Sequence, residues 1–222
     1  MSRSYRFSGT SPLHFVSYAT VGWVDVFTRV EYKSIILDSL RYCMANKGLE
    51  IYAWCIMTNH VHLIMGTIPD VKPENVLGLH KRHTSEALHK AIKSEVAESR
   101  REWLMEIFTN AGTANSNNKG NFQLWQQHNH PIELYSREVI LQKLDYLHFN
   151  PVAAGFVANA PMLKIGCGVA RRLRWEEGVV GRSYAYRILK RVPDRATTSR
   201  PTLRLRAMLA GAGSSSIYCC YF

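Results

Sequence analysis

The stretch Ala53-Trp54-Cys55-Ile56-Met57-Thr58-Asn59-His60-Val61-His62-Leu63-Ile64-Met65 decides the fold, because it holds two apolar runs separated by a short polar break. We expect strands over 49–57 and 60–66, joined at that break by a tight turn or a bulge. In a strand, residues two apart point to the same face, so His60 and His62 should project together. The apolar residues that alternate with them should fill the opposite face.

Two neutral imidazoles held side by side can bind a divalent metal ion and leave room for a third ligand. A His-x-His pair alone is weak evidence, because a strand can carry two incidental histidines. A second pair, His128 and His130, is a rival site, but Pro131 and the polar residues around it make a poorer strand. Spacing therefore favours His60 and His62 as the metal ligands. Two alternatives stay open: that these histidines are incidental, and that the metal site is at His128 and His130.

A second informative segment, residues 138–150, has helical periodicity with its apolar residues on one stripe. Tyr146 and Asn150 are four residues apart and share a face of this helix. Pro151 follows, so we expect the helix to end about there. A phenol and an amide from this helix could lie over the histidines, as a nucleophile and a third metal ligand. The chain has 11 tyrosines, and ordinary packing is the alternative role for Tyr146.

Taken together, these motifs resemble the single-tyrosine HUH transposases, the IS200-like family named for histidine–hydrophobe–histidine. The first motif is His60-Val61-His62, preceded by Met57-Thr58-Asn59. The second is Tyr146-x-x-x-Asn150 followed by Pro151-Val152-Ala153-Ala154-Gly155, which resembles the REP-associated tyrosine transposases most. The resemblance runs from about Leu13 to Val157, and the two motifs are specific only in combination.

The resemblance implies a divalent metal, Mg²⁺ or Mn²⁺, bound by His60, His62 and Asn150. Because Mg²⁺ prefers oxygen ligands, the imidazole pair favours Mn²⁺ in vitro. Tyr146 is the implied nucleophile, which would form a 5′-phosphotyrosine during nicking and strand transfer on single-stranded or hairpin DNA. A catalytically inactive hairpin-binding module and a metal-dependent phosphodiesterase that activates water are the alternatives. We expect a monomer rather than a homodimer, as the resemblance to the REP-associated branch implies.

The order of predicted elements is β-α-β-β-α-β-α, which indicates an α+β fold. We expect a ferredoxin-like antiparallel sheet with helices on one face and an additional C-terminal helix that bears the tyrosine. The first strand should cover 13–20, and a first helix should run to about residue 46 with Thr28 as its N-cap. A second helix should cover 74–96, and a fourth strand 127–134.

The second helix carries a basic face, which would suit a DNA backbone or simply be solvated. Its members are Lys81, Arg82, His83, His89, Lys90 and Lys93.

The chain should divide into a transposase-like domain over 1–157, with a flexible loop at 109–121, and a basic tail over 158–222 that is irregular or out of frame. The formal charge is +11, yet residues 1–155 carry 16 Lys and Arg against 14 Asp and Glu. Residues 156–222 carry 12 against 3. The charge that indicates nucleic-acid binding therefore resides mostly in the tail.

The tail also departs from the resemblance, which ends at Val157. Suitable codons for residues 172–181, read from their second base, would encode Asp-Tyr-Ala-Gly-Lys-Lys-Gly-Leu-Leu-Glu, close to the tail of the family. We therefore hypothesise a frameshift near residue 160. The alternative is a diverged basic tail that contacts nucleic acid.

Five cysteines, odd in number and without a paired pattern, indicate a reduced protein. No apolar run is long enough to span a membrane, and no signal-peptide core follows the N-terminus. We therefore expect a cytoplasmic protein that does not enter a membrane.

Overall fold

The computed structural model describes residue 7 and residues 12–116, 120–127, 129–156, 167–171 and 174–177. Its strands are β1 (His14–Ala19), β2 (Leu49–Ile56), β3 (His60–Thr67), β4 (Ile132–Glu133), β5 (Cys167–Arg171) and β6 (Arg174–Glu177). Its helices are the 3₁₀ helix η1 (Val21–Trp23) and the α-helices α1 (Val30–Asn46), α2 (Pro73–Ser94), α3 (Arg101–Ala114) and α4 (Arg137–Ala153).

The strands form an antiparallel sheet in the order β4-β1-β3-β2-β5-β6, so β3 lies in its interior. The predicted β2–β3 hairpin is confirmed, with Met57 donating its backbone N–H to the carbonyl of His60 across the turn. His62 pairs with Cys55 of β2 on one side and with Ser17 of β1 on the other. The histidine strand is therefore held from both edges, which fixes its register.

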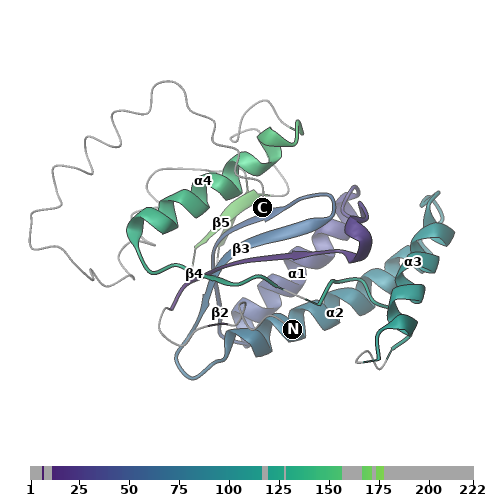
Figure 1. Cartoon of the computed structure of the whole chain (residues 1–222), viewed down its shortest axis with the longest axis horizontal. Coiled ribbons are helices and arrows are strands. Elements are labelled where there is room, and N and C mark those ends of the chain that lie inside the picture. Colours follow the sequence, from purple (N-terminus) through teal and green to yellow (C-terminus); the bar gives the residue numbers. More distant parts are fainter. Residues whose placement is uncertain are drawn as a thin grey trace, which may run out of the picture. The chain divides into compact units, whose positions relative to one another are not determined.

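The two faces of the sheet carry separate apolar clusters, as the alternation in β3 predicts. Val61, Leu63 and Met65 pack in one cluster with residues of α1, α2 and α3. Ile64 packs in the other, with residues of β1, β2 and α4. Figure 1 shows α4 on one side of the sheet and α1 and α2 on the other. The predicted α+β architecture is confirmed, and the helix that bears Tyr146 covers the face to which His62 belongs.

Helix α1 begins at Val30, one residue later than a Thr28 cap requires. Its N-cap is Arg29, which makes no side-chain capping bond, so the predicted capping box is wrong. The hydroxyl of Thr28 instead accepts a hydrogen bond from Nη2 of Arg100, at 3.2 Å. A long-range contact has therefore replaced the local cap.

Helix α2 ends at Ser94, and the expected extension to Val96 is wrong because Val96 is 90% exposed beyond the helix. Helix α3 continues to Ala114, so the predicted loop over 109–121 is wrong in its first half. The reason is tertiary: Phe108 and Gly112 of α3 are buried, and the backbone of residues 121–122 lies directly over Gly112. Polar composition alone did not reveal that contact.

The fourth strand is shorter than predicted, since β4 covers only Ile132–Glu133. His130 just before Pro131 has a positive φ of 39°, which interrupts an extended ladder. Helix α4 continues past the expected stop to Ala153, with Pro151 inside its last turn. A proline removes one backbone donor, but Ala154 still donates to the carbonyl of Asn150, so the turn closes.

Two strands, β5 and β6, lie in the tail that we expected to be irregular, and β5 pairs with β2. The expectation of an irregular tail is therefore wrong for 167–171 and 174–177. The segment near residue 160, where we place the frameshift, lies outside the described residues. The frameshift and the division at residue 157 stay predictions.

Candidate active site

His60 and His62 lie side by side on β3, with ring centroids 4.6 Å apart. His62 is 3% exposed and stacks on the ring of Phe15 from β1, at 5.4 Å. Burial, together with the neighbouring His60 and Lys143, lowers the pKa of His62 to about 3. Burial also lowers the pKa of His60 to about 4, against the opposing effect of Asp25. Both imidazoles are therefore neutral at neutral pH and keep a lone pair for a ligand.

Asn59 fixes which nitrogen of His60 carries that lone pair. Nδ2 of Asn59 donates to the carbonyl of Trp23 at 3.1 Å, so Oδ1 of Asn59 must be the atom that faces Nδ1 of His60 at 2.6 Å. An amide oxygen only accepts, and therefore Nδ1 of His60 carries the proton. Nε2 of His60 then carries the lone pair that is available to a ligand. Sequence reasoning placed Asn59 in the motif but missed this role, because the partner carbonyl lies 36 residues away.

Helix α4 brings the predicted tyrosine and amide to the histidines. Nδ2 of Asn150 lies 3.0 Å from Nε2 of His62. The ring of Tyr146 lies 5.3 Å from that of His62 and contacts Phe15 edge-on at 5.8 Å. Tyr146 is 49% exposed, so its phenol is accessible from solvent. The structure thus groups Tyr146 and Asn150 around His62, with His60 as the next ring along the strand.

Lys143 is a member of this group that sequence reasoning missed. Its Nζ lies 5.5 Å from the ring centroid of Tyr146 and 5.2 Å from that of Phe15. Desolvation lowers the pKa of Lys143. The signal was present in the sequence, because Lys143 precedes Tyr146 by three residues, a spacing that places two side chains on one helix face.

The donor set fits a divalent ion that accepts nitrogen and oxygen ligands. The distance between the facing atoms of Asn150 and His62 is 3.0 Å. Rotating the Asn150 amide by half a turn would present its oxygen, and such an exchange leaves the shape unchanged. Two imidazoles and one amide oxygen suit Mn²⁺ better than Mg²⁺. Within the described ranges no group of three His, Cys, Asp or Glu side chains could hold a metal.

The rival histidine pair is weaker in the structure. His130 is exposed and lies outside any strand, and His128 lies outside the described residues. His148 of α4, to which we gave no role in the chemistry, is largely buried, and burial lowers its pKa to about 4.

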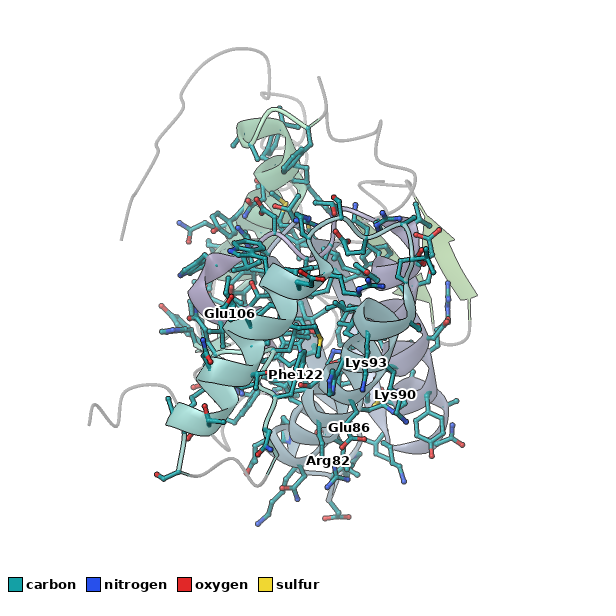
Figure 2. All side chains as sticks on the ribbon, turned by 90° about the vertical axis from the view of Figure 1, so that its right-hand side faces the viewer. Arg82, Glu86, Lys90, Lys93, Glu106 and Phe122 are labelled. Carbon is teal, nitrogen blue, oxygen red and sulfur yellow. The ribbon has the colours of Figure 1, made fainter. Side chains whose placement is uncertain are left out.

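The predicted basic face of α2 lies on the other side of the sheet from α4. Lys81 is not available to a ligand, because Nζ donates to Gln126 O and to Asn129 Oδ1, both at 2.7 Å. His89 stacks on Phe122 at 4.2 Å. Figure 2 shows Arg82, Lys90 and Lys93 along α2 with Glu86 between them. These exposed cations are not part of the histidine site.

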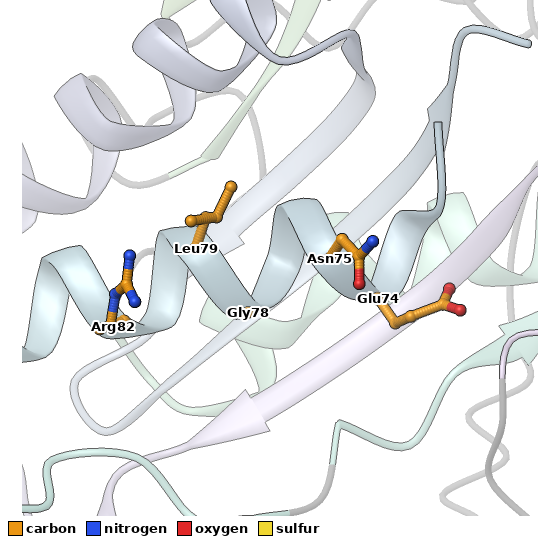
Figure 3. A pocket seen from close by; sticks show the side chains of 5 residues that line it. All are labelled: Glu74, Asn75, Gly78, Leu79 and Arg82. Carbon is orange, nitrogen blue, oxygen red and sulfur yellow. The ribbon is translucent and has the colours of Figure 1, made fainter. Parts of the chain in front are cut away.

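A shallow depression of about 420 Å³ also lies on α2, lined by Glu74, Asn75, Gly78, Leu79 and Arg82 (Figure 3). It holds none of the grouped histidine, tyrosine or amide side chains, and we assign it no chemistry.

Paired histidines on an interior strand, with a tyrosine and an amide on a helix over them, form the arrangement expected of single-tyrosine HUH proteins. The sequence pattern of the family described as "Transposase IS200 like" matches residues 19–117. The resemblance seen in the sequence is therefore confirmed by a match over fewer than half of the chain's residues. The match includes His60 and His62 and ends before Tyr146 and Asn150.

A solved structure shows the same fold. The chain is similar to a REP-associated tyrosine transposase bound to a REP hairpin, with 13% sequence identity and a TM-score of 0.54. That alignment covers 82% of this chain and 96% of the other. A candidate transposase from Deinococcus radiodurans is 19% identical over 67% of this chain and 97% of its own, with a TM-score of 0.39. No curated protein matches the sequence. Among the described residues, none of the helices is long and apolar enough to cross a bilayer.

Proposed function

We propose that this protein nicks and rejoins single-stranded or hairpin DNA through a covalent bond between Tyr146 and a 5′-phosphate. The observation that carries the proposal is the meeting of α4 with β3. One helix brings the phenol of Tyr146 beside the His62 ring, at 5.3 Å, and the amide of Asn150 to the same histidine, at 3.0 Å. The family match supports a transposase, and the similar structure with a bound REP hairpin supports hairpin DNA as the ligand.

The phenol oxygen of Tyr146 attacks the phosphorus, and the bond from phosphorus to the 3′-oxygen breaks. The phenol loses its proton to solvent, and the departing 3′-oxygen takes one up, so the products are a 5′-phosphotyrosine and a free 3′-hydroxyl. Attack by another 3′-hydroxyl reverses the step and transfers the strand. An ion bound by His60, His62 and Asn150 would polarise a phosphoryl oxygen and orient the phosphate.

Lys143 supplies a positive charge beside the nucleophile. Because its ammonium lies 5.5 Å from the Tyr146 ring, it can compensate negative charge that develops on the attacked phosphate. The half-exposed phenol lets a DNA strand reach the site without opening the core. His60 and His62 add no positive charge to the site at neutral pH, because burial lowers the pKa of both imidazoles and keeps them uncharged.

The decisive experiment incubates the full chain with a labelled REP-type hairpin bearing a single-stranded 5′ extension, in Mn²⁺, and separates the products under denaturing conditions. A covalent protein–DNA adduct that is absent in Tyr146→Phe supports the proposal. Binding without cleavage favours the inactive hairpin-binding module. Cleavage that persists in Tyr146→Phe favours the phosphodiesterase that activates water. Tyr135→Phe is the control, because Tyr135 is also exposed and precedes α4.

The oligomeric state and location are also proposals. We propose a monomer, since the rings of Tyr146 and His62 in the same chain already lie 5.3 Å apart. Light scattering on the purified chain tests this, and a dimer would contradict it. A cytoplasmic location stays a prediction.

A further inference from the structure

Trp23 places an exposed indole beside the histidine pair. It ends η1 with a φ of 55°, in the left-handed region that bulky residues rarely adopt. Its side chain is nevertheless 57% exposed, so core packing does not explain the strained backbone. Strain of this kind concentrates where a protein holds a group ready for a ligand.

The backbone around Trp23 is fixed to the turn that precedes His60. The carbonyl of Trp23 accepts from Nδ2 of Asn59 at 3.1 Å, and its N–H donates to the carbonyl of Thr20, also at 3.1 Å. Thr20 in turn donates its own N–H to the carbonyl of Asn59 at 2.9 Å. The indole is thereby held against His60, with ring centroids 5.6 Å apart and planes at 70°.

The rings at the site follow one another in the order Trp23, His60, His62, Tyr146. The successive centroid distances are 5.6, 4.6 and 5.3 Å. The exposed indole therefore lies at the His60 end of this row, and the phenol lies at the His62 end. A DNA strand whose phosphate lies at the histidines would carry a neighbouring base to Trp23.

We propose that Trp23 is a stacking platform for an unpaired nucleobase next to the phosphate bound at the histidines. An indole is uncharged, so it recognises the flat face of a base rather than the phosphate. Bases inside a duplex are already covered on both faces, so the ligand is a single-stranded nucleotide. This inference rests on the proposed function and specifies which protein group contacts the base.

The test measures binding by fluorescence anisotropy, using the full chain with Tyr146→Phe to prevent covalent capture. The probes are fluorescein-labelled oligo(dT) of about 20 nucleotides and an abasic strand of equal length, which has the phosphates without the bases. Trp23→Gly removes the indole and suits the left-handed backbone, so this variant should fold. Trp23→Phe keeps an aromatic face. Tyr42→Ala is the matched control, because Tyr42 is also 57% exposed but lies on α1, across the sheet.

We expect Trp23→Gly to weaken oligo(dT) binding about five- to hundred-fold, the range that loss of one base–aromatic stack produces. Trp23→Phe should lose much less, and neither variant nor Tyr42→Ala should change binding of the abasic strand. Equal oligo(dT) affinity in the parent and Trp23→Gly overturns the stacking role and leaves the proposed function intact. A parent that binds neither oligo(dT) nor a REP-type hairpin overturns both. A parent that binds the hairpin alone overturns only the stacking role.

Discussion

Nδ2 of Asn150 on α4 lies 3.0 Å from Nε2 of His62 on β3, and this contact joins the last turn of the tyrosine helix to the interior of the sheet. Asn150 lies one helical turn after Tyr146, so the contact also positions the phenol. Three residues later α4 ends at Ala153. The amide therefore joins the last turn of the helix directly to β3.

Replacing Asn150 tests whether its amide is a metal ligand. Asn150→Leu should weaken Mn²⁺ binding at least about tenfold, because an aliphatic group has no donor atom. Asn150→Asp should bind Mn²⁺ as tightly as the parent or more tightly, since a carboxylate is a stronger oxygen ligand. Calorimetric titration with Mn²⁺ measures both. Unchanged affinity in Asn150→Leu would remove Asn150 from the ligand set.

Asn59 should act on the metal through His60 without touching it. Asn59→Ala removes the acceptor that holds the proton on Nδ1 of His60, and loss of such an orienting partner typically weakens metal binding about 10- to 100-fold. The same titration measures this effect. Asn46→Ala is the control, because Asn46 also donates its amide to a carbonyl, that of Tyr42, on the surface of α1. Equal losses in both variants would indicate a general loss of stability instead.

Lys143 should accelerate adduct formation by its charge. Lys143→Met should slow the single-turnover appearance of the covalent adduct about tenfold or more, which corresponds to about 1.4 kcal/mol in the barrier. Lys143→Arg should recover part of the rate, because it keeps the charge. Lys47→Met is the matched control, since the Nζ of Lys47 also lies over a tyrosine ring, at 5.9 Å, but on α1. A rate in Lys143→Met equal to the parent would refute the role.

Buried His80 should make the protein sensitive to acid. Its ring nitrogens lie 2.8 Å from the Tyr18 hydroxyl and 2.9 Å from the Ser39 hydroxyl, and burial lowers its pKa to about 3. In the unfolded chain a histidine titrates near 6.5, so between these values the unfolded state binds more protons. The free energy of unfolding should therefore fall as the pH drops from about 6.5 toward 3, with a slope of up to about 1.4 kcal/mol per pH unit from this residue.

Urea unfolding at a series of pH values measures that slope. His80→Leu should be less stable at neutral pH, because two hydroxyls lose a partner, yet its stability should decline less steeply in acid. The slope of the free energy of unfolding against pH distinguishes the loss of His80 titration from the loss of its packing. A slope identical to that of the parent would show that His80 does not titrate in this window.

The nucleotide sequence of the gene tests the predicted frameshift. A shift near residue 160 predicts that the second-base frame across residues 172–181 encodes Asp-Tyr-Ala-Gly-Lys-Lys-Gly-Leu-Leu-Glu. Codons that do not give this peptide would refute the hypothesis and leave a diverged basic tail.

Local pattern was sufficient to predict the hairpin of β2 and β3, because alternation fixes which side chains share a face. The spacing of Tyr146 and Asn150 likewise indicated one helix face, and the structure places that face at His62. These predictions succeeded because the periods of strands and helices are set by the backbone. The roles of the grouped residues stay predictions.

The features that the sequence did not reveal depend on contacts between distant segments. The Asn59 amide is oriented by the carbonyl of Trp23. Thr28 accepts a hydrogen bond from Arg100 instead of capping α1, which begins at Val30 without a capping box. Helix α3 continues through a polar stretch because residues 121–122 cover Gly112. Long-range pairings of this kind have no signature in a single sequence.

Tyr146, Asn150 and Lys143 all belong to α4, whereas both histidines belong to the sheet. The helix docks through Ile140, Leu144 and Leu147. Under the proposed mechanism, undocking α4 would withdraw the phenol, the amide and the ammonium from the histidines in one movement. The proposed activity therefore depends on a few aliphatic contacts that themselves take no part in the chemistry.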